Sequence, residues 1–102
     1  MEIRTYQDSE GRAPFDHWLQ AMPDRTARAK IRARLARVEA GNFGDCKPLR
    51  DGVQELRIDR VYFSRQGQVL VLLLCGSDKS EQSREITRAI AYLNDWKERG
   101  KP

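Results

Sequence analysis

The sequence predicts a single α+β domain with the element order β-α-α-β-β-β-α. Its 102 residues can form one hydrophobic core and are too few for a second. Three observations predict the fold class: a short alternating segment at the start, two stretches of helical periodicity after it, and an unbroken apolar run at residues 69–75. A short apolar run of this kind is typical of a strand that is buried on both faces.

The composition limits the classes of protein to which this chain can belong. The chain is 39% hydrophobic and 33% charged, as expected for a small soluble domain with a modest core. We find no apolar stretch of the kind that a signal peptide or a membrane span needs, so we expect a cytoplasmic protein without membrane contact. The two cysteines, Cys46 and Cys75, lack the spacing of metal ligands, and we expect no metal and no cofactor.

The first strand and helix follow from alternation and from proline positions. Residues 2–7 alternate, with Ile3 and Thr5 on one side, and predict a short strand. Pro14 suits the first position of a helix. The apolar residues that follow are spaced for one helical face, and Pro23 ends the helix: they are Phe15, Trp18, Leu19 and Met22.

A second helix is predicted from an Asp24 cap to about Ala40, and Gly41 stops it. It forms a helical hairpin with the first helix. Its apolar stripe is accompanied by many arginines; the stripe consists of Ala27, Ile31, Leu35 and Val38. Residues 41–48 are predicted to be a loop because they contain two glycines and a proline.

Three strands and a helix complete the fold. Alternation predicts strands at 53–58 and 60–65, and the apolar run predicts a central strand at 69–75. Short links between them imply an antiparallel meander. Asp78, with Glu81 three residues later, has the spacing of a helix cap, and the last helix should run from about Ser80 to Arg99. We expect the first strand to join this meander in an antiparallel four-stranded sheet, with the helices on one face.

Positive charge is concentrated in the middle of the chain. Residues 24–65 contain eleven Lys/Arg and six Asp/Glu, whereas residues 77–102 contain six and five. This distribution favours a polyanionic partner, either nucleic acid or an acidic protein segment. A solvated basic helix accounts for it equally well.

Several ordered motifs give the chain a resemblance to a known family. They are PFDHWL (14–19), ARAKIRARLARVEAGNFGDCKPL (27–49), GVQELRI (52–58), RVYF (60–63) and VLLLCGSDKSEQ (71–82). In this order they resemble RelE/ParE-superfamily toxins, and most closely the HigB-like branch of addiction-module killer proteins. The resemblance implies a RelE-like fold and a type II toxin neutralised by an antitoxin, often a helix-turn-helix protein. For the RelE and HigB branches it also implies cleavage of mRNA on the ribosome.

The sequence departs from this family at one loop. Relatives usually carry a Gly-Pro-Gly-Tyr-like loop before the arginine of RVYF, whereas Ile58, Asp59 and Arg60 are continuous here. A tight hairpin needs about two loop residues. Either Ile58 and Arg60 are therefore used in the turn, or the two strands form one longer bent strand.

Metal-independent RNA cleavage requires a base for the 2′-OH, a cation for the phosphorane and an acid for the leaving 5′-oxygen. The one histidine, His17, lies away from the motif strands, and we expect a structural or surface role for it. The predicted catalytic residues are therefore Arg57, Arg60, Tyr62 and Lys79. Residues predicted to bind nucleic acid are Lys47, Arg50, Arg28, Arg32 and Gln82. Arg57 and Tyr62 are alternatively explained by cross-strand pairing on a solvated sheet face.

Two other functions are also compatible with the sequence. A ParE-like toxin would bind DNA gyrase and cleave no RNA, and a degenerate toxin with a shortened loop would bind only its antitoxin. The combination of Arg57, Arg60, Tyr62 and Lys79 favours a ribosome-dependent endoribonuclease, because a gyrase-binding protein needs no group of residues that cleaves phosphodiesters.

Overall fold

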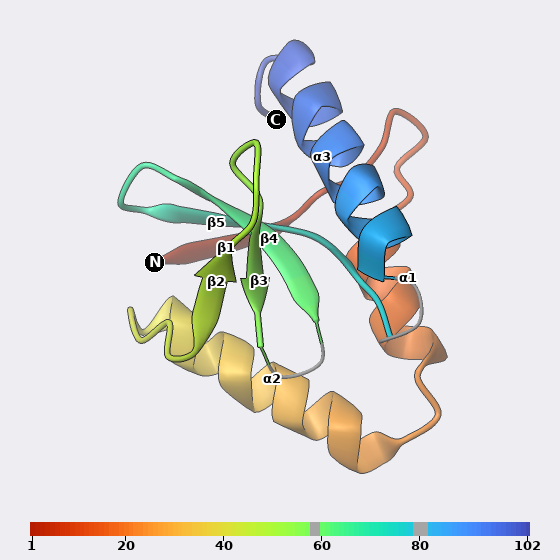
Figure 1. Cartoon of the computed structure of the whole chain (residues 1–102), viewed down its shortest axis with the longest axis vertical. Helices are drawn as coiled ribbons and strands as arrows, with labels where there is room; N and C mark the ends of the chain where they lie inside the picture. Colours follow the sequence, from red (N-terminus) through yellow and green to blue (C-terminus); the bar gives the residue numbers. More distant parts are fainter. Residues whose placement is uncertain (58–59, 79–81) are drawn as a thin grey trace.

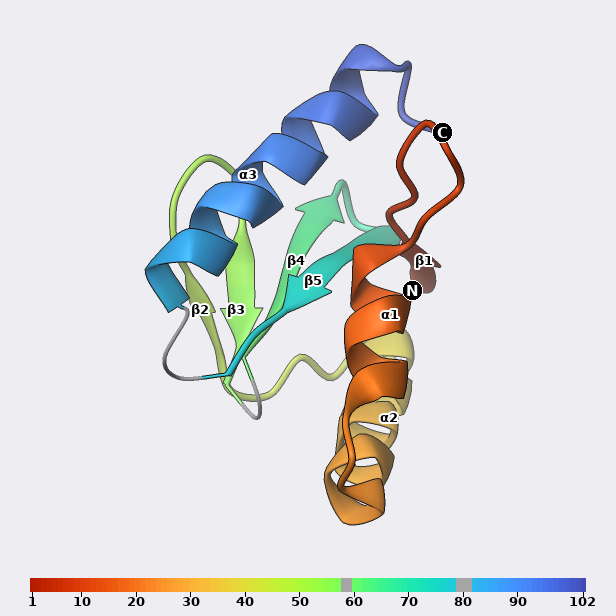
Figure 2. The same ribbon diagram turned by 90° about the vertical axis from the view of Figure 1, so that its right-hand side faces the viewer.

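The protein is a five-stranded mixed sheet between two helical layers (Figures 1 and 2). The computed structural model describes residues 1–57, 60–78 and 82–102. In chain order the elements are β1 (Glu2–Thr5), α1 (Pro14–Ala21), α2 (Arg25–Glu39), β2 (Cys46–Pro48), β3 (Gln54–Leu56), β4 (Val61–Gln66), β5 (Leu70–Gly76) and α3 (Gln82–Glu98). The predicted α+β class is confirmed, with one strand more than expected. Within the described residues, no helix is both long enough and apolar enough to cross a membrane.

The helical hairpin forms where the sequence predicts it. Pro14 is the first residue of α1, where its missing N–H costs no hydrogen bond. The Asp24 carboxylate accepts hydrogen bonds from the backbone N–H groups of Thr26 and Ala27 and so caps α2. At the other end of α2, Gly41 has a φ of 96°, a backbone conformation that glycine adopts without strain.

The strand order is β1-β5-β4-β3-β2. Strands β3, β4 and β5 form the predicted antiparallel meander. However, β1 pairs with β5 in parallel, with Ile3 opposite Val71, so the prediction of a wholly antiparallel sheet is wrong. Alternation shows which face of a strand is apolar, but it does not show the direction of the strand beside a distant partner.

The additional strand β2 lies at the end of the segment that was predicted to be a loop. It pairs with β3, and Lys47 stands opposite Glu55. Pro48 has no N–H for a ladder and is tolerated because β2 is at the edge of the sheet. Because proline and glycine are uncommon inside strands, the sequence pattern predicted a loop here instead of a strand.

Helices cover both faces of the sheet, so the prediction that they cover one face is also wrong (Figure 2). On the face of α1 and α2, the buried cluster includes Phe15, Ile31 and Phe63. On the face of α3, it includes Tyr62 and Leu93. Because β4 and β5 carry apolar side chains on both sides, a single helical layer would leave one set in water.

Strand β5 is buried on both faces, as predicted. Residues 71–75 are at most 3% exposed, and the strand lies inside the sheet between β1 and β4. Val69 is the exception, because it precedes the strand and is 70% exposed.

A β-bulge in β5 decides which way its last residues face. Tyr62 pairs with Cys75 but Phe63 pairs with Leu73, so Leu74 is the extra residue. Leu74 and Cys75 therefore both belong to the α3-side cluster. Gly76 instead faces α1, because a Cβ built there would meet the ring of Trp18.

The connection between β3 and β4 resolves one of the alternatives left by the sequence. Leu56, the last residue of β3, pairs with Val61, the first of β4. Arg60 precedes β4 with a φ of 54°, in a region that is uncommon for residues other than glycine. Arg60 is thus part of the turn, and the strands are separate; Ile58 and Asp59 lie outside the described residues.

Candidate functional site

A row of four residues crosses the sheet on the face that carries α3. Lys47 pairs with Glu55, Glu55 with Tyr62, and Tyr62 with Cys75, across β2, β3, β4 and β5. Directly opposed residues point to the same side of a sheet. Lys47 is exposed at the sheet edge and the other three are buried, so the row leads from a surface cation to a buried carboxylate.

Glu55, the second residue of this row, is a buried acid. The residue is 5% exposed, and its Oε2 accepts a hydrogen bond of 3.4 Å from the Gln82 side-chain amide at the start of α3. Burying a carboxylate is costly unless polar partners surround it. Holding this carboxylate where β3 meets α3 therefore costs folding free energy.

Tyr62 follows Glu55 in the row and is fully buried. Its hydroxyl shares a hydrogen bond of 3.0 Å with Ser77 Oγ. Burial raises the pKa of the phenol, the Ser77 hydrogen bond and the Arg60 charge lower it, and the Glu55 charge raises it further. Tyr62 is therefore a neutral phenol near pH 7, and its ring is not available at the surface for stacking on a base.

Arg60 joins the same group of residues. Its backbone carbonyl accepts a 3.2 Å hydrogen bond from the Ser77 N–H, its charge acts on Tyr62, and the residue is half-buried. We call Glu55, Arg60, Tyr62, Ser77 and Gln82 the polar cluster. It contains three residues that the sequence predicted for the site, Arg60, Tyr62 and Gln82.

Arg57 has a different environment from the polar cluster. Its guanidinium lies 3.9 Å from an Asp45 carboxylate oxygen, its side chain is 51% exposed, and its backbone N–H donates to the Asp45 carbonyl. The Arg34 guanidinium of α2 donates to the same carbonyl at 3.1 Å. These contacts tie Arg57 to α2 and leave its charge accessible to solvent.

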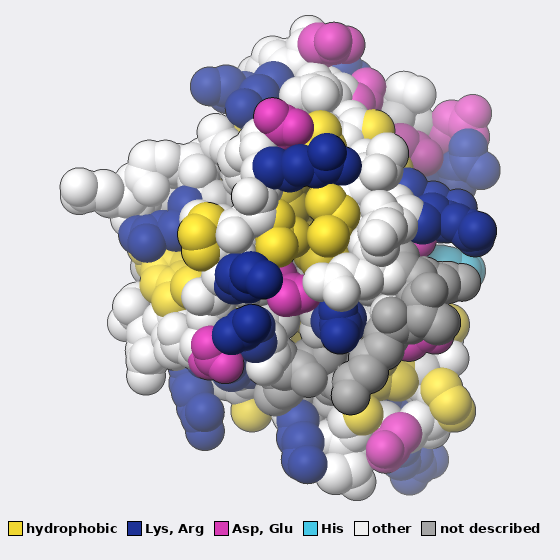
Figure 3. All heavy atoms as spheres, viewed as in Figure 1, with side chains coloured by type: hydrophobic (Ala, Val, Ile, Leu, Met, Phe, Trp, Pro, Cys, Tyr) yellow, Lys and Arg dark blue, Asp and Glu magenta, His cyan; other side chains and the backbone are white. Residues whose placement is uncertain are grey.

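The other predicted site residues are spread over the surface. Arg32 is exposed and Arg28 half-buried on α2, while Lys47 lies on β2 and Arg50 in the turn after it, both exposed. Lys79 lies outside the described residues. So does Glu81, with which Asp78 was predicted to cap the last helix. Figure 3 shows Lys and Arg side chains among Asp and Glu on one face, so positive charge is interspersed there with negative charge.

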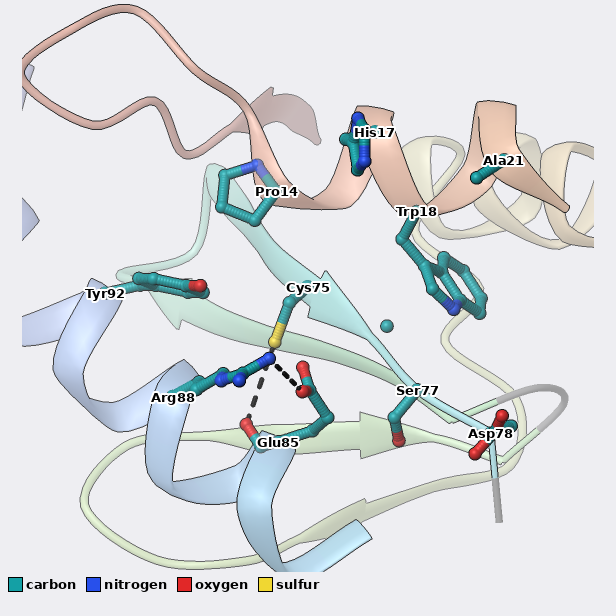
Figure 4. A pocket seen from close by; sticks show the side chains of 11 residues that line it. Pro14, His17, Trp18, Ala21, Cys75, Ser77, Asp78, Glu85, Arg88 and Tyr92 are labelled. Atoms are coloured by element: carbon teal, nitrogen blue, oxygen red, sulfur yellow. Dashed lines mark hydrogen bonds and ion pairs between the residues drawn. The ribbon is translucent and has the colours of Figure 1, made fainter. Parts of the chain in front are cut away.

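A cavity of about 360 Å³ opens beside the polar cluster, between α1, the end of β5 and α3 (Figure 4). Ser77 belongs to both features. Trp18 and Pro14 line the cavity from α1 and Tyr92 lines it from α3. The Trp18 ring fits against Gly76 so closely that a Cβ there would lie 2.4 Å from ring atoms.

The polar lining of this cavity includes an ion pair of α3, formed by Glu85 and Arg88, together with His17, Ser77 and Asp78. The Glu85 side chain is 8% exposed, and its Oε1 lies 2.8 Å from a nitrogen of the Arg88 guanidinium. Cys75 is beside them, with Sγ 3.8 Å from the Glu85 carbonyl. Burial, and then the Glu85 charge, raise the pKa of the Cys75 thiol to about 12, so the cysteine is a neutral packing residue here.

Sequence reasoning missed several members of both features. Glu55 was placed correctly on a strand, but its burial depends on the pairing register. Ser77 follows the apolar run of residues 69–75 and was given no role in the site. His17 lines the cavity although it was assigned a structural or surface role. Among the described residues, no cluster of three or more His, Cys, Asp or Glu is arranged to hold a metal ion.

The fold and the site define a small α+β protein with a polar cluster at one end of a mixed sheet. No family model matches the sequence. The chain is 51% identical over 80 residues to an uncharacterized protein of Haemophilus influenzae (strain ATCC 51907 / DSM 11121 / KW20 / Rd), a match that covers 74% of this chain and 81% of the relative. The chain belongs to the same family as that protein.

Proposed function

We propose that this protein is the toxin of a type II toxin-antitoxin system, of the RelE/ParE superfamily and its HigB-like branch, and that it cleaves mRNA on the ribosome in the cytoplasm. The observation that carries the proposal is the polar cluster. It combines a buried carboxylate, Glu55, with a nearby arginine, Arg60, and both lie in motifs, GVQELRI (52–58) and RVYF (60–63), that resemble those of these toxins.

In this proposal the 2′-oxygen of the RNA attacks the adjacent phosphorus as the bond to the 5′-oxygen breaks. The products are a 2′,3′-cyclic phosphate and a 5′-hydroxyl. Arg60 stabilises the phosphorane charge, since preorganised positive charge supplies a large share of such catalysis. Arg57, which is accessible, holds a neighbouring phosphate, and Lys79 protonates the leaving oxygen.

We assign the proton-accepting role to Glu55 instead of Tyr62. The raised pKa of Tyr62 keeps it protonated, and its hydroxyl is engaged by Ser77. Among the described residues, Glu55 accepts one side-chain hydrogen bond, the 3.4 Å contact from Gln82, and it can accept the 2′-hydroxyl proton once RNA displaces that contact. Tyr62 then serves to position Ser77 and the end of β5.

One observation favours a second candidate, the degenerate toxin. Arg60 occupies a left-handed position inside a connection of four residues, 57–60. If that short connection prevents Arg60 from reaching a phosphate, the protein would bind its antitoxin without cleaving RNA. A ParE-like gyrase-binding toxin is the third candidate.

Primer extension on mRNA after induced expression distinguishes these functions. We expect discrete cuts at fixed positions within codons, together with growth arrest. With purified ribosomes the cuts should persist when a chelator removes transition metals and Mg²⁺ is kept at the level that holds ribosomes intact, because the mechanism uses protein groups only.

The other outcomes are equally informative. DNA damage without RNA cuts would favour the gyrase-binding toxin. Neither cuts nor growth arrest would favour the degenerate toxin. Loss of cleavage upon removal of transition metals from intact ribosomes would overturn the metal-independent mechanism.

The proposed antitoxin, a helix-turn-helix protein with an acidic segment, should approach the basic residues of α2 first. We expect Arg28→Glu with Arg32→Glu to slow antitoxin association, to flatten its salt dependence and to weaken ribosome binding. Exposed charges act mainly on association rates, and each lost phosphate contact lowers the salt slope by about one. Stopped-flow association at several salt concentrations measures this.

The matched control for this pair is Lys97→Glu with Lys101→Glu. It makes the same charge change at exposed residues near the end of the chain. If the α2 pair slows association no more than the control pair, the basic residues of α2 are a solvated face and the charge argument fails.

A further inference from the structure

The cavity beside the polar cluster has aromatic walls from two helices. Trp18 reaches it from α1 and Tyr92 from α3, and Figure 4 shows them on different sides of the space. A volume of about 360 Å³ is within the range of small-ligand sites, roughly 300–1,000 Å³. Flat aromatic walls favour a flat ring as the ligand, because nucleic-acid bases stack on such side chains.

Two of the polar groups in the cavity, Glu85 and Arg88, form a definite hydrogen-bonding pattern, and His17, Ser77 and Asp78 line other parts of it. Glu85 offers carboxylate oxygens, which only accept hydrogen bonds, and Arg88 offers N–H groups, which only donate. They are held side by side by their 2.8 Å ion pair, and the Glu85 side chain is 92% buried (8% exposed). A ligand that meets both must therefore present donors to Glu85 next to an acceptor for Arg88.

Guanine is the base that offers two adjacent donors, one for each oxygen of the Glu85 carboxylate, beside an acceptor. Along one edge it carries O6, which accepts, followed by N1–H and the N2 amine, which both donate. Adenine has one donor on that edge, uracil has one between two acceptors, and cytosine has one beside two acceptors. We propose that the cavity binds a guanine base, with Arg88 donating to O6 and Glu85 accepting from N1–H and N2–H.

The Glu85–Arg88 ion pair opposes the main competing ligand, a cationic side chain of a protein partner, at its own end of the cavity, whereas Asp78 lines another part of the cavity. Arg88 already neutralises Glu85 and would repel a second guanidinium or ammonium at short range. A neutral ring that carries both donors and an acceptor makes use of the ion pair without breaking it. This observation favours guanine over an arginine or lysine anchor.

The guanine can belong to an RNA strand or to a free nucleotide. The RNA source rests on the proposed function: Ser77 joins the cavity to the polar cluster, so a nucleotide extruded from the strand would reach the cavity while its neighbour lies at Glu55. The base itself is recognised in the same way in both cases.

Binding can be followed through the fluorescence of Trp18. The only other tryptophan, Trp96, is 3% exposed in the α3-side core. We expect GMP to bind at least about 10-fold more tightly than IMP, which lacks only the N2 amine, and than AMP, because the buried carboxylate loses a charge-assisted hydrogen bond. A short RNA with one guanosine should lose affinity similarly when that guanosine is replaced by inosine.

Two variants link the preference to Glu85. Glu85→Gln keeps the size of the side chain and should abolish the preference for GMP over IMP. Glu98→Gln, the same change at an exposed position of α3, should leave it intact. If Glu85→Gln fails to fold, as judged by circular dichroism, the comparison of guanosine with inosine on the unaltered protein still decides.

Equal binding of GMP and IMP, or no binding of either nucleotide or RNA, would overturn the guanine site. Binding of free arginine that changes Trp18 fluorescence more than GMP does would assign the cavity to a protein partner. Failure of the proposed function is distinguishable: GMP discrimination without any mRNA cleavage leaves the guanine site standing with a free nucleotide as its ligand. Cleavage with no discrimination removes the guanine site and leaves the nuclease.

Discussion

Replacement of Glu55 by glutamine should slow mRNA cleavage by about 10²–10⁴-fold, the usual contribution of a positioned general base. Glutamine has nearly the same shape as glutamate, and its side-chain oxygen can still accept the hydrogen bond that Gln82 donates to Glu55. What the variant lacks is a group that can take up the 2′-hydroxyl proton. The fold and antitoxin binding should therefore be preserved.

Single-turnover cleavage on programmed ribosomes, measured across pH, tests this role. In the unaltered protein the rate should depend on pH, and the part of that dependence that belongs to the general base should disappear in Glu55→Gln. Glu98→Gln is the matched control, with the same change at an exposed site on α3. A folded Glu55→Gln protein that cleaves at the normal rate would show that another group is the base.

Tyr62→Phe provides a contrasting result for the same assay. It removes the hydroxyl that bonds Ser77 at 3.0 Å, so stability should fall by about 1 kcal/mol. Cleavage should change far less than in Glu55→Gln, because the phenol is not assigned a proton transfer. The two variants together distinguish a loss of cleavage rate, expected in Glu55→Gln, from a loss of stability, expected in Tyr62→Phe.

The sequence was most informative where one residue fixes a local conformation. Pro14, the Asp24 carboxylate and Gly41 set the ends of α1 and α2 by local rules, and these ends were predicted within one or two residues. The apolar run of β5 was equally clear, because seven consecutive apolar residues permit few other solutions.

Features that depend on distant partners were not predictable in the same way. The parallel pairing of β1, the short edge strand β2 and the second helical layer all arise from contacts between segments far apart in the chain. The bulge at Leu74 is invisible in a uniform apolar run, yet it decides that Cys75 faces α3 and Gly76 faces α1. The cavity could not be predicted for this reason.

The candidate site shows the same division. Arg60, Tyr62 and Gln82 were selected from motifs, and the structure brings them together. Glu55 was overlooked because a charged residue on an alternating strand is normally solvent-facing. Glu55 is buried because α3 covers its face of the sheet. The sequence predicted that all helices cover one face, and that prediction was wrong.

Gly76→Ala should destabilise the protein by about 1–3 kcal/mol, the usual cost of overpacking. An ideal Cβ at Gly76 would lie 2.4 Å from atoms of the Trp18 ring, far inside van der Waals contact, so the ring must move. Backbone strain plays no part: six of the seven glycines have a positive φ, and Gly76 is the exception. The effect therefore reports the packing of Trp18, which supplies the three atoms nearest to the added Cβ.

A double-mutant cycle makes this argument decisive. Without the indole, alanine at position 76 meets no ring, and Gly→Ala at an unstrained position typically stabilises by about 0.4–1 kcal/mol through the unfolded chain. Gly76→Ala should thus destabilise the unaltered protein and stabilise Trp18→Ala, with a coupling of about 1.4–4 kcal/mol between the two sites. Urea unfolding of the four proteins gives the four free energies. An equal effect of Gly76→Ala in both backgrounds would mean that Trp18 does not lie against Gly76, and the cavity wall built on that contact would have to be redrawn.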